Sequence, residues 1–384
     1  MILPDFHLPT EIYIRQNIID EISDICIKYG KRAIIVITEK DMATYHDAVE
    51  NTSNLLKSAG LGAIIYDQLP EDPNTEEIDQ AVIYAKKTSC DLVIGFGGIN
   101  SLNASKAIAL LTNNFLFSHD LFNDPQNIQK PVNLLTIPTH PVFGLEITPI
   151  VFINDIHDKV QKSYHNTLLY PVACIVDPSI SLKQPVDDTM KSCISTLAVA
   201  TESIISKRNN DIINTYALKS IDFIFRNISL VYREPDNVTP RRFLSAASVM
   251  SGIAFSLNYL SITLAISLSL SSLSDIDIYS SMCIILPHIM EFNLTSSPGK
   301  YVQMSKVMGE DVKDITVIEA AIKAVEAIRK LETDINIPQR LSQYNVDKSM
   351  LKKAAALTLT HGFIQNAPRD LDASEVETIL IAAY

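Results

Sequence analysis

Cysteine pairs and basic runs are the two features most clearly missing from this sequence. Five cysteines are spread over 384 residues without a CxxC pair, which argues against a disulfide framework and a cysteine-based zinc site. The net charge is −12 with no basic run, so neither nucleic acid nor a membrane is an expected partner. The N-terminus shows no basic segment followed by an apolar one. No secretory signal is therefore predicted, and a reducing cytoplasm is the expected location.

What is present is typical of a folded protein with two domains. Apolar residues make up 47% and charged residues 20% of the chain. A chain of 384 residues is too long to fold around one simple hydrophobic core. One uncharged segment, 245–274, is long enough to cross a bilayer. Its serine clusters and Gly252 favour a buried helix pair instead, and the membrane span remains the alternative.

The first half of the sequence alternates β-branched runs with helical stretches. Strands are predicted at 32–38, 62–66, 91–94 and 133–137, and amphipathic helices at 41–59 and 75–88. Strands end near 172–178, and only helical periodicity follows from about Pro185. This order predicts an α/β Rossmann-like N-terminal domain, residues 1–184, with helices on both faces of a parallel sheet. An all-helical C-terminal domain, residues 185–384, is predicted to follow.

A glycine turn lies between a predicted strand and a predicted helix. The sequence there is GFGGINSLNASKAIAL, from Gly95 to Leu110. Exposed N–H groups at a helix N-terminus attract phosphate, so strand, glycine turn and helix together are typical of a nucleotide site. Only Gly97 and Gly98 precede Ile99, where a further small residue is expected. The sequence predicts that the bend is kept and that phosphate binding is weakened.

Several stretches together resemble the iron-containing alcohol dehydrogenase family. GGINSLNASKAIA is similar to that family's GGGSxxDxAKAIA, and IPTHPVFGLEITP to IPTTAGTGSEVTP. CIVDPSISLKQP, ILPHIMEFN and NAPRDLDASEVETIL follow in the family's order. The resemblance implies a fold of the dehydroquinate synthase-like type and a substrate cleft between the domains. It also implies a dimer, NAD(P) on the first domain and a divalent metal on the second.

The family's metal ligands have no counterpart in this sequence. The resemblance places the Asp and His of one helix on Ser195 and Val199, and two further His on Leu264 and Ile278. The family's additional catalytic His falls on Leu268. No His occurs in 192–200 or 260–279, so a shift in alignment restores nothing, and Asp275 and Asp277 lie at a predicted turn. We therefore expect no metal at this site and an apolar core in its place.

The dinucleotide site is expected to be recognisable but altered. An acid at the first strand end, Glu39, favours NAD over NADP because it repels a 2′-phosphate. In the second loop, Pro141, Val142 and Phe143 replace smaller residues. NAD is expected to bind weakly or not at all, with the following positions as its candidate contacts: Glu39, Gly97, Gly98, Asn100, Ser101, Thr139 and Lys162.

Few histidines are placed to take part in chemistry. His140 follows the fourth predicted strand, beside the expected nicotinamide position, and is the candidate acid. For His288 a packing role is the preferred interpretation, and Glu146 and His361 have no supporting pattern.

Two functions remain open from the sequence. The preferred one is a relative of oxidoreductase lineage that has lost metal-dependent alcohol dehydrogenation and keeps the fold for binding or assembly. The alternative is a metal-independent NAD(P)H-dependent reductase of an activated carbonyl, similar to maleylacetate reductases, with His140 as the acid. The scarcity of glycine, 11 residues in all, favours the first.

Overall fold

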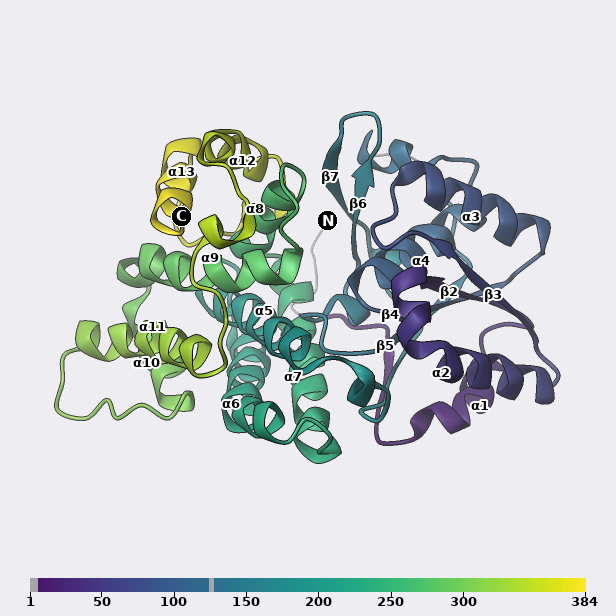
Figure 1. The fold of residues 1–384 in the computed structure, drawn as a ribbon, viewed down its shortest axis with the longest axis horizontal. Coiled ribbons are helices and arrows are strands. Elements are labelled where there is room, and N and C mark those ends of the chain that lie inside the picture. The colour runs from purple at the N-terminus through teal and green to yellow at the C-terminus, as the bar shows by residue number, and fades with distance from the viewer. Residues whose placement is uncertain (1–5, 124–127) are drawn as a thin grey trace. The chain divides into compact units, whose positions relative to one another are not determined.

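The structure is a computed structural model that describes residues 6–123 and 128–384 (Figure 1). Contacts divide it into two units. The sheet unit comprises Leu8–Pro185 and Asp236–Ser245, and the helical unit comprises Val186–Pro235 and Ala246–Tyr384. Phe6 and His7 group with the helical unit. The units differ from the predicted ranges 1–184 and 185–384 mainly because the segment Asp236–Ser245 groups with the sheet.

The sheet unit is built on six parallel strands in the order β1-β8-β5-β4-β2-β3. The strands are β1 (Glu11–Ile14), β2 (Arg32–Thr38), β3 (Gly62–Leu69), β4 (Leu92–Gly97), β5 (Asn133–Pro138) and β8 (Ala173–Val176). The helices between them are α1 (Ile22–Cys26), α2 (Glu39–Ser58), α3 (Thr75–Lys87) and α4 (Ile99–Thr112). The four predicted strands and two predicted helices are confirmed. The sequence analysis missed β1 and an antiparallel hairpin of β6 (Ile150–Asp155) and β7 (Val160–His165).

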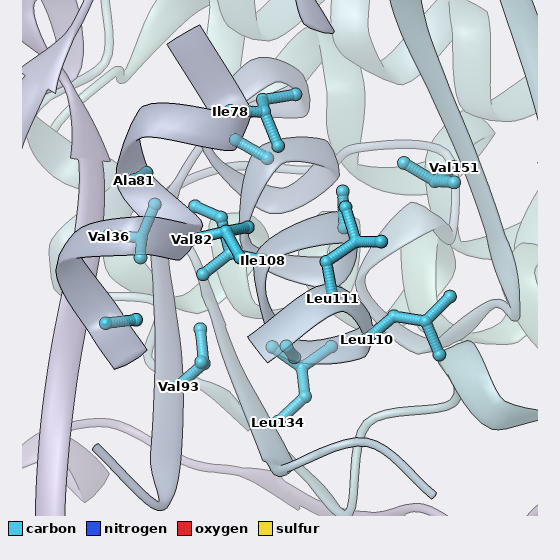
Figure 2. Close-up of a cluster of buried hydrophobic side chains, with 14 of the residues drawn as sticks. Val36, Ile78, Ala81, Val82, Val93, Ile108, Leu110, Leu111, Leu134 and Val151 are labelled. Carbon is cyan, nitrogen blue, oxygen red and sulfur yellow. The ribbon is translucent and has the colours of Figure 1, made fainter. Parts of the chain in front are cut away.

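Both faces of the sheet are covered, as predicted. Ile34 and Val36 of β2 face a cluster that contains side chains of α3 and α4 (Figure 2). Ala33 and Ile35, which alternate with them, face a cluster formed with α1 and α2. This alternation follows from the period of two along a strand, and a strand covered on both sides is apolar throughout.

The strand order contains a switch point between β2 and β4. From β2 the chain continues through α2 to β3 on one side, and from β4 through α4 to β5 on the other. Ligands of open α/β sheets bind at the carboxyl ends of the strands at such a point. The glycine turn lies at that end of β4, so the topology places it where a nucleotide is expected.

The helical unit contains nine α-helices, counting α7, which starts within the segment that groups with the sheet. They are α5 (Val186–Ile205), α6 (Asp211–Arg233), α7 (Val238–Asn258), α8 (Ile262–Ser271), α9 (Ile278–Asn293), α10 (Pro298–Val307), α11 (Val317–Asp334), α12 (Leu351–Thr358) and α13 (Ala373–Ala382). No strand occurs in this unit among the described residues. Within the described ranges, no single helix is long and apolar enough to cross a membrane; α7 and α8 pass that test only as a pair, bent by 99°.

Candidate functional site

The glycine turn has the predicted strand–turn–helix geometry. Strand β4 ends at Gly97, Gly98 is the N-cap of α4, and the helix starts at Ile99. Gly97 has φ 141°, a conformation that side-chain-bearing residues rarely adopt. Helix α4 is buried on nearly all sides. The bend is therefore kept, and it is fixed by the core around it.

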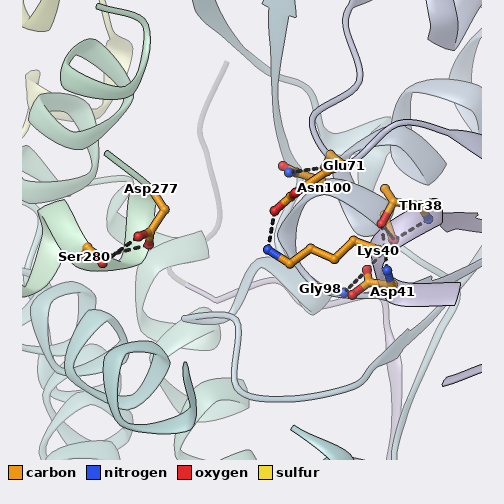
Figure 3. A network of polar contacts seen from close by, with 9 residues as sticks. Thr38, Lys40, Asp41, Glu71, Gly98, Asn100, Asp277 and Ser280 are labelled. Carbon is orange, nitrogen blue, oxygen red and sulfur yellow. Dashed lines mark hydrogen bonds and ion pairs between the residues drawn. The ribbon is translucent and has the colours of Figure 1, made fainter. Parts of the chain in front are cut away.

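The carboxylate of Asp41 occupies the anion-binding position of this turn. Asp41 lies in the first turn of α2, directly after the neighbouring strand β2. Its Oδ2 accepts the Gly98 N–H at 2.9 Å (Figure 3). The same oxygen accepts the Ser101 hydroxyl at 2.6 Å. A helix N-terminus attracts anions through its free N–H groups and its dipole. Here the anion is a side chain of the protein itself.

Asn100, which was also predicted to contact a dinucleotide, is engaged within the protein. Its side-chain amide donates to the Glu71 carbonyl at 2.6 Å. The Glu71 carboxylate pairs with Lys40, which follows the first-strand acid Glu39 (Figure 3). Glu39 itself is exposed at the start of α2. The structure thus brings Gly97, Gly98 and Ser101 together around Asp41, and it gives Asn100 a different partner.

His140 also lies against the turn. A Cβ atom built on Gly98 would be 2.8 Å from His140 Cε1, so the ring is in direct contact with the turn. Thr139 donates its N–H to the Gly97 carbonyl at 3.2 Å, and its hydroxyl lies 3.0 Å from His140 Nδ1. Burial lowers the pKa of His140 to about 4, although the Asp41 carboxylate acts in the opposite direction. His140 is therefore a neutral imidazole at neutral pH.

The second loop is folded into the core. Val142 and Phe143 are fully buried. Behind them Lys106 of α4, also fully buried, donates to the carbonyls of Leu145 at 2.6 Å and Ile150 at 2.8 Å. Burial lowers the pKa of Lys106 to about 7, against the attraction of Glu146. Lys106, the lysine of the GGINSLNASKAIA motif, therefore has a structural role: it joins the second loop to α4.

Lys162 has partners in its own hairpin. Its ammonium lies 2.7 Å from the Asp155 carboxylate and also pairs with Asp158. His119 contacts the same Asp155 carboxylate at 3.0 Å. These contacts tie β7 to β6, and a role for Lys162 in dinucleotide binding remains a prediction.

In the helical unit, the positions of the family's metal ligands and of its additional catalytic His carry buried side chains. Val199, Leu264 and Leu268 are 0% exposed and Ile278 is 8% exposed. Helix α5, which carries Ser195, packs against α8 and α9. The Ser195 hydroxyl lies 3.0 Å from the Lys191 carbonyl and 3.4 Å from the Tyr279 carbonyl, next to Ile278. The structure therefore brings the aligned positions of α5 and α9 together, as a shared site requires.

Two side chains near these positions that could bind a metal, Cys283 and Asp277, have other contacts. Cys283 Sγ lies 3.4 Å from the same Lys191 carbonyl, and burial raises the pKa of its thiol well above the usual value. Asp277 caps α9 through Ser280, accepting its N–H at 2.8 Å and its hydroxyl at 2.6 Å (Figure 3). The side chains that most often bind Fe²⁺ or Zn²⁺ are deprotonated thiols, carboxylates and neutral imidazoles. Throughout residues 6–123 and 128–384, no three such groups cluster to form a metal site.

Asp41 is the residue at the glycine turn that the sequence analysis missed. A signal for it exists, because Asp41 follows one predicted strand and the glycine turn follows another. The carboxyl ends of neighbouring parallel strands meet at the same edge of the sheet. The missing information was that β2 and β4 are neighbours, which requires the strand order.

Comparison with known proteins decides the family. The family model for iron-containing alcohol dehydrogenases matches residues 9–178. The model for the C-terminal domain of the same family matches residues 189–384. The chain belongs to the iron-containing alcohol dehydrogenase family. The fold predicted from the resemblance is thereby confirmed.

Relatives in this family match over the full length. The chain is 25% identical to 1,3-propanediol dehydrogenase of Klebsiella pneumoniae, covering 99% of this chain and 98% of that protein. It is 22% identical to NAD-dependent methanol dehydrogenase of Bacillus methanolicus, covering 98% and 99%. A solved 1,3-propanediol oxidoreductase superposes with a TM-score of 0.93 at 25% identity, with 100% of both chains covered. The alcohol dehydrogenase from Oenococcus oeni, at 20% identity and a TM-score of 0.94, with 100% of both chains covered, has the same fold.

Proposed function

We propose that this family member has lost metal-dependent alcohol dehydrogenation and retains the fold for a binding or assembly role. The observation that carries the proposal is the chemistry of the ligand positions: Ser195, Val199, Leu264 and Ile278 are buried, and three of the four are apolar. A divalent ion in such a site loses its hydration shell without gaining anionic or imidazole ligands, which is strongly unfavourable. Without the ion, nothing at these positions polarises the oxygen of an alcohol or carbonyl.

Weak or absent dinucleotide binding is the second part of the proposal. The Gly98 N–H and the Ser101 hydroxyl already have an anionic partner in Asp41. A dinucleotide diphosphate needs the same donors, so it competes with a side chain that is always present. Dimer formation, carried over from the family, stays a prediction.

The alternative function, reduction of an activated carbonyl without a metal, requires a proton donor beside the nicotinamide. His140 is the candidate, but burial lowers its pKa to about 4. A general acid is effective when its pKa lies near the working pH, and a group largely deprotonated at neutral pH is a poor one. This observation favours the non-catalytic proposal.

The proposal is tested by assaying the purified chain with NAD⁺, added Fe²⁺ or Zn²⁺, and either 1,3-propanediol or methanol. The Klebsiella 1,3-propanediol dehydrogenase serves as the positive control. We expect no NADH formation above the rate without enzyme. Metal-dependent turnover would overturn the proposal. Metal-independent NADH consumption with an activated ketone, abolished by His140→Asn, would instead establish the alternative.

A further inference from the structure

We infer that Asp41 is an internal ligand of the glycine turn and is the residue that excludes a dinucleotide diphosphate from it. The inference rests on the second part of the proposed function, weak dinucleotide binding, and assigns it to one side chain. It differs from the prediction made from the sequence, which assigned the weakness to the bulk of Ile99, Val142 and Phe143. In the structure Ile99 is 7% exposed and the other two are fully buried.

The position of Asp41 follows from the strand order. Strands β2 and β4 are hydrogen-bonded neighbours, with Val36 in register with Gly95. Their carboxyl ends lie together at the switch point, where α2 and α4 both begin. Asp41 is in the first turn of α2 and contacts the N-cap of α4, so two helix N-termini face one carboxylate. Such a position favours a negative charge.

The contacts of Asp41 are those that a bound phosphate would use. Its Oδ2 accepts the Gly98 N–H at 2.9 Å and the Ser101 hydroxyl at 2.6 Å. Ser101 also accepts the Thr38 N–H at 3.0 Å, which fixes its hydroxyl between the two strands. A Cβ atom built on Gly97 would be 2.2 Å from the same carboxylate oxygen. The space that glycine leaves open for a ligand is thus filled by Asp41.

A diphosphate therefore meets two obstacles at this turn. The donors it needs are engaged, and a like charge lies in the position that its oxygens must reach. Like charges a few ångströms apart repel, and charge-assisted hydrogen bonds are stronger than neutral ones. His140, the titratable group that contacts the same turn beside Asp41, is held mainly in its neutral form because burial lowers its pKa to about 4. Dinucleotide binding requires that Asp41 leave the turn.

Two substitutions at Asp41 separate charge from occupancy. Asp41→Asn keeps the size and the acceptor oxygen and removes the charge, while Asp41→Gly removes the side chain. Asp24→Asn in α1, an exposed acid, is the matched control for the change in net charge. The measurement is calorimetric titration of the full chain with NADH, without metal and without substrate.

We expect no saturable binding to the wild-type chain or to the Asp24→Asn control. Asp41→Gly should bind NADH with measurable affinity, at least about tenfold tighter than the wild-type chain. The affinity of Asp41→Asn should lie between those of the wild-type chain and Asp41→Gly. Unchanged affinity in both Asp41 variants would overturn the inference, even with dinucleotide binding absent throughout. Micromolar binding by the wild-type chain, abolished by Gly98→Val, would overturn the second part of the proposed function and the inference with it. If Asp41→Gly does not fold, Asp41→Asn still decides the test, because it keeps the size and shape of the side chain and removes only the charge.

Discussion

Asp41 Oδ2 and Gly98 N are 2.9 Å apart and join the first turn of α2 to the N-cap of α4. The contact is not local in sequence. The two residues are 57 positions apart and meet because β2 and β4 are adjacent strands. The contact satisfies an N–H that a helix N-terminus otherwise leaves to solvent or ligand. If Asp41 is an internal ligand of the turn, this contact should stabilise the folded chain, and that contribution can be measured.

Removing the Asp41 side chain should destabilise the chain. Asp41→Ala leaves the Gly98 N–H and the Ser101 hydroxyl without their anionic acceptor, and we expect a loss of about 1–3 kcal/mol in the free energy of unfolding. Urea denaturation measures it, with Asp24→Ala as the control for net charge. Equal stability of the Asp41→Ala and Asp24→Ala variants would mean that the contact contributes nothing.

The contact between His140 and Gly98 predicts a coupled pair of substitutions. Gly98 has φ −88°, which any residue adopts, but a Cβ there would be 2.8 Å from His140 Cε1. Gly98→Ala should therefore cost about 1–3 kcal/mol in an intact background, through overpacking. In a His140→Ala background the same substitution should be nearly neutral. A double-mutant cycle by urea denaturation tests this, and equal costs in both backgrounds would show that the ring does not restrict position 98.

The stability of the chain should depend on pH through His140. Its pKa is about 4 in the folded chain, because of burial, against an ordinary value of 6.5. Below pH 4 both states bind the proton, and between pH 4 and 6.5 mainly the unfolded state does. Stability from this group therefore rises with pH across that window, by about 3 kcal/mol at most. As pH falls from 6.5 to 4, the same amount is lost.

The measurement is urea denaturation of wild-type and His140→Asn chains between pH 4 and 7. The unfolding free energy of the wild-type chain should rise relative to that of His140→Asn as the pH increases from 4 to 6.5, because asparagine does not titrate. His46→Asn, which removes an exposed imidazole of α2, is the control. A constant difference between wild type and His140→Asn across the window would mean that burial does not shift the titration of His140.

Restoring the family's metal ligands should destabilise the folded chain and should not restore alcohol dehydrogenation. The quadruple variant Ser195→Asp, Val199→His, Leu264→His and Ile278→His places four polar groups in a packed apolar region. We expect a loss of several kcal/mol in the metal-free variant. An apolar control, Val199→Ile, Leu264→Met and Ile278→Leu, measures the cost of altered packing alone. An unchanged melting temperature of the metal-free quadruple variant would contradict the view that these positions are core.

The sequence was sufficient for the parts of the fold that depend on local periodicity. The run 32–38 has a clear strand pattern and became β2 with the same bounds, and the glycine turn became the bend between β4 and α4. Strand β1 and the β6–β7 hairpin were missed: β1 is only four residues long, and part of β7 is polar.

The site was only partly predictable from the sequence, for a physical reason. Gly97, Gly98 and Ser101 belong to a local motif, whereas Asp41 depends on which strands are neighbours. Lys162 also depends on pairing, because its partner Asp155 lies on the other strand of a hairpin that was not predicted. Ser195 and Ile278 could be assigned only through the family resemblance, and the structure places them on packed helices.

Elemental analysis of the purified full-length chain, after equilibration with Fe²⁺ and Zn²⁺ and removal of unbound ions, tests the central claim most directly. Metal bound by four proper ligands is held tightly and remains stoichiometric through such treatment. The account predicts far less than one ion per chain, with no difference between wild type and a Ser195→Ala variant. About one divalent ion per chain, lost on substitution of Ser195 or its neighbours on α5 and α9, would contradict it.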